Sequence, residues 1–277
     1  MKKKAFLYLA VCAGFILVIL LGGENSGISK ISSNSPVSEE FYYFNPDSPQ
    51  TNLGRLKKEF DAYLFEKNIP FTFQPFTHFV DFHRLCRENR PSFLLVPQWY
   101  YRKYGRALGL KPFLVPIRNG KTSYEKILLT AQDAKGTAND YEIISFAMTD
   151  MGPENERALI DDLVAEDVIS LQQFNVIIVP KDLDAIFALV LGQVKMALVS
   201  RDNLRVISDA NPRIVNIVKI LRKSITVPMP VLCYMENRVD PGDVKMMVET
   251  LKRMVAEHPR NKIMEMLQID DWRKFTE

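Results

Sequence analysis

Residues 174–203, FNVIIVPKDLDAIFALVLGQVKMALVSRDN, constrain the fold of this chain more than any other stretch. Residues 176–179 and residues 196–199 are apolar runs of strand length, and the first run stops at Pro180. The segment between the two runs suits a short helix. Two buried strands joined by a buried helix form a βαβ unit, which is typical of parallel sheets that are covered on both faces. The stretch therefore predicts an α/β fold.

The helix of this unit should be short and buried. Asp182 can cap a helix that begins near Leu183, and Asp184 is favourably placed against the dipole of the first turn. Residues 185–190 leave the helix apolar on nearly every side, which indicates burial. Gly192 suits the residue that follows a helix end.

The composition limits the classes of function. The chain has 277 residues, of which 47% are hydrophobic, so it can bury the core of one large domain or of two lobes. Its formal net charge is +3, and Lys2, Lys3 and Lys4 form its one run of three basic residues. Because the chain has no basic stripe with interleaved aromatic residues, we do not expect it to bind nucleic acid.

Residues 1–22 have the pattern of a secretory signal peptide, since three lysines precede the apolar run 5–21. That run is also near the minimum length of a membrane-spanning helix, so an uncleaved anchor with a cytoplasmic N-terminus is an alternative. Residues 23–40 are rich in Gly, Ser and Asn and predict a flexible tether. We therefore expect the rest of the chain to be periplasmic or otherwise extracytoplasmic, either secreted or anchored by its N-terminus.

Residues 41–130 alternate between expected strands and helices and form the predicted first lobe. We expect strands at residues 41–44, 69–73, 93–96, 113–117 and 124–130, and helices at residues 53–64 and 79–86. In open α/β sheets, ligands bind at the carboxyl ends of the strands. Two loops, 45–51 and 98–101, follow such strands and are candidates for the wall of a small-molecule cleft. Trp99 and Tyr100 of the second loop could equally be packing residues.

The histidines and cysteines form no catalytic or metal-binding pattern. His78 and His83 have no third ligand at a metal-site spacing, so solvated or core histidines are the simpler interpretation, and we predict no metal and no cofactor. Cys86 and Cys233 could form one disulfide in an oxidising compartment or remain two buried thiols. The absence of a Ser/His/Asp or Cys/His arrangement and of a Gly-rich nucleotide loop argues against an enzyme.

We predict a second lobe at residues 131–225 and a return to the first lobe at residues 226–277. The expected elements are a strand at 141–148, a helix from Pro153, the βαβ unit, a helix at 214–221, an extended segment at 224–230, a strand at 231–235, and helices at 240–256 and 261–267. The start of the helix at Pro153 could bind an anion, but nearby acidic residues already place negative charge there.

Several segments resemble the phosphate-, phosphite- and phosphonate-binding family of periplasmic substrate-binding proteins, which serve ABC transporters. VPKDLDAIFALVLGQVKMALVS is similar to that family's succession of strand, helix, Gly and strand. The family's strand and Pro-aromatic turn resemble FLLVPQWYY. Its return strand and following helix resemble TVPMPVLCYMENRVDPGDVKMMVETLKRM, and its closing helix resembles IMEMLQIDDWRKF. Together these segments extend the resemblance over residues 41–275.

The resemblance implies two α/β lobes of the type II periplasmic-binding-protein-like fold, which close on a ligand in the cleft between them. It implies a ligand site made of Asn45, Ser48, Tyr100, Thr149, Asp150 and Ser200. Hydroxyl and amide groups would donate hydrogen bonds, Tyr100 would form a wall, and Asp150 would accept from an amine or a protonated group. The turn MTDMG at residues 148–152 departs from the family's Ser/Thr-rich turn, so the ligand could be phosphate, a phosphonate or another small solute.

The leading hypothesis is therefore an exported, non-catalytic solute-binding protein that passes a small molecule to the permease of an ABC transporter. The alternative is a membrane-anchored sensory or interaction module that uses the same fold without transport. An uncleaved N-terminal segment and the lack of a small ligand would favour this alternative.

Overall fold

The structure is a computed structural model, and it describes residues 39–50, 52–133, 144–152, 156–157, 174–257 and 261–276. The predicted signal peptide or anchor at residues 1–22, most of the predicted tether, and most of the predicted helix after Pro153 lie outside these residues. Among the helices of the described residues, none combines the length and the apolar character that a membrane span requires.

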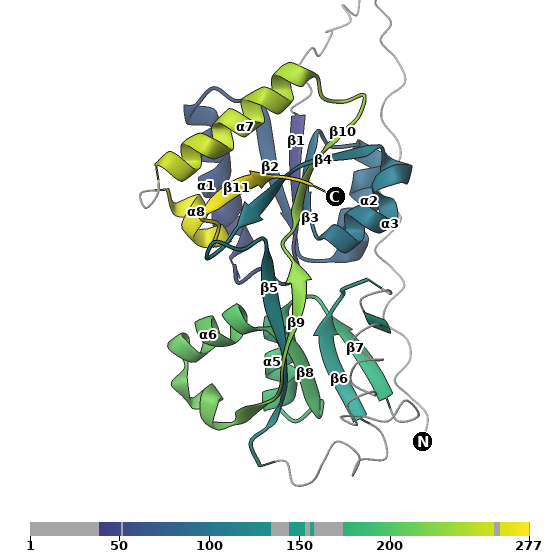
Figure 1. Cartoon of the computed structure of the whole chain (residues 1–277), viewed down its shortest axis with the longest axis vertical. Coiled ribbons are helices and arrows are strands. Elements are labelled where there is room, and N and C mark those ends of the chain that lie inside the picture. The colour runs from purple at the N-terminus through teal and green to yellow at the C-terminus, as the bar shows by residue number, and fades with distance from the viewer. Residues whose placement is uncertain are drawn as a thin grey trace, which may run out of the picture. The chain divides into compact units, whose positions relative to one another are not determined.

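Two β-sheets organise the described residues (Figure 1). The first sheet has the strand order β11-β4-β10-β3-β1-β2, in which β1 is parallel to β2 and β3, and β10 is antiparallel to β3 and β4. Its strands are β1 (Glu39–Phe44), β2 (Phe71–Phe76), β3 (Phe93–Val96), β4 (Leu110–Ile117), β10 (Val231–Met235) and β11 (Asp271–Lys274). Its helices are α1 (Leu53–Glu66), α2 (Phe79–Asn89), α3 (Gln98–Leu108), α7 (Pro241–Ala256) and α8 (Lys262–Leu267).

The sequence FYYF of β1 explains why helices cover both faces of the first sheet. Successive side chains of a strand point to opposite faces, and here both faces are apolar. Phe41 belongs to an apolar cluster with residues of α1, α7 and α8, and Tyr42 belongs to another with residues of α2 and α3. Figure 1 shows these two groups of helices on opposite sides of the sheet. The first sheet is therefore a buried layer, as the α/β prediction requires.

The second sheet has the strand order β7-β6-β8-β5-β9. Its strands are β5 (Ser123–Ala131), β6 (Ile144–Thr149), β7 (Phe174–Val179), β8 (Met196–Ser200) and β9 (Val218–Pro228), and its helices are α5 (Asp182–Val190) and α6 (Arg201–Ala210). β6 is parallel to both β7 and β8, whereas β5 is antiparallel to β8 and β9. Two sheets of mixed α/β structure confirm the predicted fold class.

The predicted βαβ unit is present as β7, α5 and β8. Ala185 and Ile186 of α5 are buried in an apolar cluster with residues of β6 and β8, and Gly192 has the positive φ of +72° expected after the helix end. However, β7 is an edge strand, and Ile178 is 50% exposed. The prediction that both strands of the unit are buried is therefore wrong for β7.

The expectation of a loop at residues 98–101 is wrong, because these residues form the first turn of α3. Pro97 is the N-cap of this helix. Tyr100 and Tyr104 lie four residues apart and therefore share a helix face, where their ring centroids are 4.9 Å apart. The aromatic run is thus the buried stripe of a helix.

The predicted helix at residues 214–221 is also wrong. Pro212 begins a short 3-10 helix (Pro212–Asn216), and β9 then pairs antiparallel with β5. The β-branched residues of this segment favour a strand once a partner strand is available. β5 itself belongs to the second sheet, although most of its residues fall in the range predicted for the first lobe.

Cys86 and Cys233 are buried free thiols, which decides between the two alternatives that the sequence left open. Burial raises the pKa of the Cys86 thiol to about 12 and raises the pKa of Cys233 as well. Since the thiolate is the reactive form of cysteine, both residues act as small apolar core residues.

Candidate functional site

The loop after β1 carries the contribution of the first sheet to the site. The Asp47 N–H donates to Asn45 Oδ1 at 3.2 Å, and the Ser48 N–H donates to the Asn45 carbonyl at 3.1 Å. Such a turn, closed by an Asn side chain, is a common way to reverse a loop tightly. The turn holds Asp47 in a position where the residue is only 7% exposed.

Lys126 of β5 supplies a fully buried positive charge. Its Nζ lies 2.7 Å from Asp47 Oδ1 and 3.2 Å from Asp182 Oδ1, and it donates to Thr149 Oγ1 at 2.5 Å. A lysine ammonium has three N–H donors, so these three oxygens satisfy it completely.

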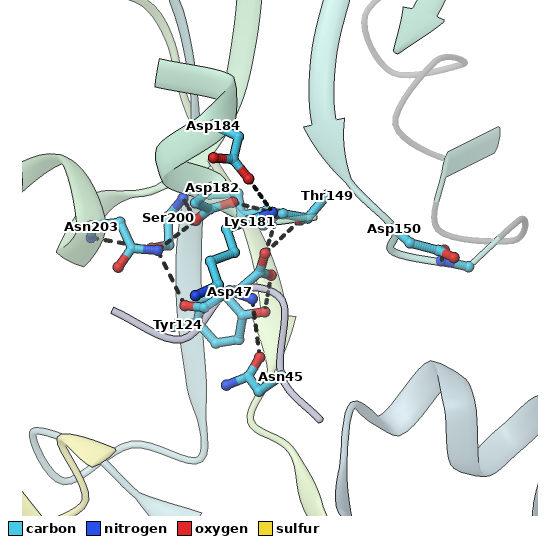
Figure 2. A network of polar contacts seen from close by, with 12 residues as sticks. Asn45, Asp47, Tyr124, Thr149, Asp150, Lys181, Asp182, Asp184, Ser200 and Asn203 are labelled. Carbon is cyan, nitrogen blue, oxygen red and sulfur yellow. Dashed lines mark hydrogen bonds and ion pairs between the residues drawn. The ribbon is translucent and has the colours of Figure 1, made fainter. Parts of the chain in front are cut away.

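The Asp47 carboxylate is the point at which the two sheets meet. Besides Lys126, its Oδ1 accepts a hydrogen bond from the Thr149 hydroxyl, and its Oδ2 accepts one from the Tyr124 hydroxyl, both at 2.5 Å. Thr149 ends β6, and Tyr124 lies near the start of β5, so all three donors come from the second sheet. Figure 2 shows Tyr124 and Thr149 gathered around Asp47.

Asp182 holds Lys126 from within the second sheet. It is the first residue of α5, whose N-cap is Lys181, so the prediction that Asp182 caps this helix is wrong. Its Oδ2 instead accepts from the Ser200 N–H at 2.6 Å and from Asn203 Nδ2 at 2.9 Å. The Ser200 hydroxyl caps α6 by accepting from the Asn203 N–H at 3.2 Å. The start of α6 therefore fixes Asp182, and Asp182 fixes Lys126.

Burial and charge set the ionisation of this cluster. Burial alone would raise the pKa of Asp47, but the charge of Lys126 and the hydrogen bonds from Lys126, Thr149 and Tyr124 hold it below its ordinary value. Burial and the negative charge of Asp47 raise the pKa of Asp182 to about 6. Burial alone would lower the pKa of Lys126, but the two carboxylates raise it. Lys126 and Asp47 are thus a charged pair at neutral pH.

A small cavity lies beside this cluster. Residues from both sheets and their connections line it, among them Asn45, Asp47, Trp99, Tyr124 and Asp150. Its volume is about 10 Å³, which is close to the minimum that a single water molecule needs. The cavity marks the cleft between the sheets, and in this conformation it cannot hold a solute.

Three of the six predicted site residues belong to the second sheet or directly follow its strand β6, and all three lie near the Asp47 cluster or its cavity. Thr149 contacts Asp47 directly, Ser200 supports Asp182, and Asp150 lines the cavity. The Asp150 carboxylate accepts from the Gly152 N–H at 2.8 Å, and Figure 2 shows it apart from the network. A role for these side chains in ligand binding stays a prediction.

The other three predicted residues come from the first sheet. Asn45 lines the cavity but uses its side chain to close the Asp47 turn, and Ser48 Oγ accepts from the Gln50 N–H at 3.3 Å within the same loop. Tyr100 is fully buried, and its hydroxyl lies 3.1 Å from His83 Nδ1. Its ring belongs to the core between α2 and α3, so it forms no wall of the cavity in this structure.

Lys126 is the residue of this cluster for which the sequence carries a signal. It stands inside the strand YEKILLT, where Leu128, two residues further on, is buried in an apolar cluster. A charge that a strand directs into a core needs a buried partner of opposite charge, which is a readable signal. The sequence carries no such signal for Asp47, Tyr124 and Asn203, which stand in polar or mixed segments without a distinguishing pattern. Over the described part of the chain, no group of His, Cys, Asp and Glu residues is arranged to hold a metal ion.

The comparisons with known proteins agree with this architecture. The family model of the ABC transporter, phosphonate, periplasmic substrate-binding protein matches residues 42–277. The chain belongs to this family. It is accordingly a solute-binding protein of the ABC transporter type with an extracytoplasmic location, and the sensory or interaction alternative is not favoured. No match was found among the curated proteins.

Three solved structures are similar to this chain. A binding protein component of an ABC phosphonate transporter from Pseudomonas aeruginosa is 13% identical, with a TM-score of 0.70 over 86% of this chain and 81% of that one. A Prochlorococcus marinus protein in complex with methylphosphonate is 10% identical, with a TM-score of 0.69 over 86% and 92%. A Xanthomonas citri protein bound to a chloride ion is 10% identical, with a TM-score of 0.64 over 86% and 91%. At such low identity these likenesses show the fold alone.

Proposed function

We propose that this solute-binding protein captures a small oxyanion of the phosphonate type and delivers it to the permease of an ABC transporter. The observation that carries the proposal is the convergence of a buried ammonium and two hydroxyls, from Lys126, Thr149 and Tyr124, at the boundary between the two sheets. Charged and hydroxyl donors in a buried site are the groups that bind an oxyanion strongly. The Prochlorococcus marinus relative in complex with methylphosphonate supports this choice of ligand.

Binding requires the two sheets to separate. The cavity of about 10 Å³ has no room for a phosphonate, so the solute must enter while the first-sheet loop is withdrawn from the second sheet. Two connections, β4 to β5 and β9 to β10, join the sheets and are the natural hinges. Hinge closure of this kind is a common way for two-lobed proteins to enclose a ligand.

The proposal includes a purely binding role. His83 gives no support for catalysis, since its ring stacks on Phe79 and contacts Tyr100 within the first-sheet helices. We further propose that residues 1–22 either direct export or remain as a membrane anchor that keeps the protein beside its permease.

A thermal-shift and calorimetry screen tests the proposal. Phosphate, phosphite, methylphosphonate and 2-aminoethylphosphonate would be compared with a set of sugars and amino acids. A ligand at about a hundred times its dissociation constant stabilises the folded state by about 2.7 kcal/mol. We expect stabilisation by at least one phosphorus oxyanion. Stabilisation only by solutes of another class would contradict the ligand assignment and leave the transport role in place.

A pair of matched variants locates the site. Thr149→Val should weaken binding of the active oxyanion, because it removes a hydroxyl from the cluster. Thr130→Val is the control, because Thr130 lies in the same sheet and donates to the Lys195 carbonyl at 3.1 Å, away from the cluster. Equal effects of the two variants would show that the ligand binds elsewhere.

A further inference from the structure

Asp47 occupies the second sheet in the way that a bound anion would. Its carboxylate receives three charged or hydroxyl donors, at 2.7 Å from Lys126 and at 2.5 Å from both Thr149 and Tyr124. All three donors belong to the second sheet, whereas Asp47 belongs to the loop after β1 of the first. A carboxylate on a loop of the first sheet therefore contacts three donors that all lie on strands of the second sheet.

The donors do not depend on Asp47 for their positions. Asp182 keeps its own contact with Lys126, at 3.2 Å, and is itself held by the Ser200 N–H and by Asn203. Thr149 ends a strand that is paired with β7 and β8. If the Asp47 loop withdraws, the three donors remain as a preorganised pocket for one oxyanion group.

We propose that Lys126, Thr149 and Tyr124 form a binding site for a singly charged oxyanion, and that the Asp47 carboxylate is an internal occupant which the solute must displace. The inference rests on the proposed function and deepens it, because it names the charge of the ligand and a competitor within the chain. Asp47 thereby sets how strongly the protein holds its ligand. It also holds the two sheets together when no solute has replaced it.

The charges of the cluster select a single negative charge. Asp47 and Asp182 together bring two carboxylates to the one ammonium of Lys126. Replacing Asp47 by a monoanion, such as a carboxylate or a singly protonated phosphonate, leaves this balance unchanged. A dianion would add a further buried negative charge without a partner, which is strongly unfavourable.

The test removes the internal occupant and supplies it from solution. In Asp47→Ala, the remaining β-carbon plus a formate ion reproduces the atoms of the missing carboxylate. Calorimetric titration with formate and with methylphosphonate should give dissociation constants at least about tenfold lower for Asp47→Ala than for the wild type. The double variant Asp47→Ala/Lys126→Met should lose this gain, since it lacks the ammonium.

The control loosens the sheets without touching the anion site. Asp202 of α6 pairs with Arg118, which follows β4, at 3.2 Å, and this pair is another ionic contact between the second sheet and the first. Asp202→Ala removes one contact between the sheets but leaves Asp47 in place, so it should raise the affinity for both anions much less than Asp47→Ala does. An equal gain in Asp202→Ala would overturn the proposal, because loosening alone would then explain it, and so would the absence of any gain in Asp47→Ala.

The outcomes separate this inference from the proposed function. If the wild type binds methylphosphonate tightly and Asp47→Ala binds it with the same affinity, the internal-occupant proposal is contradicted and the phosphonate assignment stands. A formate gain in Asp47→Ala, with no phosphorus oxyanion bound by either protein, would support the anion site and reject the phosphonate assignment.

Discussion

Replacing Lys126 by Met tests whether the buried cluster holds the structure together. Met has a similar length and no charge, so the variant removes the ammonium from between Asp47 and Asp182 with little change in volume. At an effective dielectric constant of about 20, the pair at 2.7 Å is worth about 6 kcal/mol and the pair at 3.2 Å about 5 kcal/mol, before the cost of desolvating the three charges. That cost is large and offsets most of the attraction.

Removing one partner of a buried ion pair typically lowers the free energy of unfolding by about 3–5 kcal/mol, and this range gives the expected net loss. We expect Lys126→Met to lower the free energy of unfolding by this amount at neutral pH, because two carboxylates would stay buried without a counter-charge. The loss should shrink as the pH falls, since protonation of Asp47 and Asp182 removes the repulsion between them. Urea unfolding followed by circular dichroism measures both effects.

Lys111→Met is the matched control. Lys111 pairs with Glu236 at 3.4 Å, but the two side chains are 49% and 53% exposed. Exposed pairs contribute about 0–1 kcal/mol, so this variant should be nearly neutral. If Lys126→Met costs no more than Lys111→Met, the buried cluster does not stabilise the fold and the reasoning about its charges is refuted.

Two further predictions concern residues near the Asp47 cluster and its cavity. The pKa of Asp182 is about 6 in the folded protein, against about 3.9 in the unfolded chain. The folded state therefore binds the proton more tightly than the unfolded state does. The free energy of unfolding should fall by roughly 3 kcal/mol as the pH rises from about 4 to about 6. In Asp47→Asn this fall should be smaller in a pH series of urea unfolding, because the charge of Asp47 is one of the causes of the raised pKa. Gly152→Ala should lower the unfolding free energy by about 1–3 kcal/mol, measured in the same way, because Gly152 has a φ of +80° and an added Cβ would lie 3.0 Å from Trp99 Cβ. A neutral result would show that the backbone there relaxes freely.

Local pattern was sufficient to predict most elements of the fold. The continuous aromatic run of β1 and the helical spacing of residues 240–256 are strong local signals, and the structure confirms both elements. Asp240 and Asn261 cap α7 and α8 by accepting N–H groups of the first turn. Such elements are predictable because the forces that form them act between residues close in the sequence.

The wrong predictions concern segments whose structure depends on residues that are distant in the sequence. The segment at residues 214–221 has apolar spacing that suits a helix. However, β5 lies about 90 residues earlier in the chain and offers this segment a pairing edge, in the register Leu129↔Ile220. Similarly, Tyr100 looked like a cleft residue because the turn after β3 could not be distinguished from the first turn of a helix. Its burial depends on His83 and on the helix α2, which periodicity along the chain does not show.

The candidate site was harder to predict than the fold because its residues owe their roles to one another. Thr149 and Ser200 were predicted as cleft residues through the family resemblance, and both stand at the ends of strands of the second sheet. Asp47 was not, since an Asp in a polar loop is ordinary until the loop of one sheet is known to reach the other. Lys126 was not either, although a lysine among buried strand residues calls for a buried partner of opposite charge. Their pairing at 2.7 Å joins residues that are 79 positions apart in the sequence, and under the proposed function the charge of this pair, rather than the fold, decides which solute the chain holds.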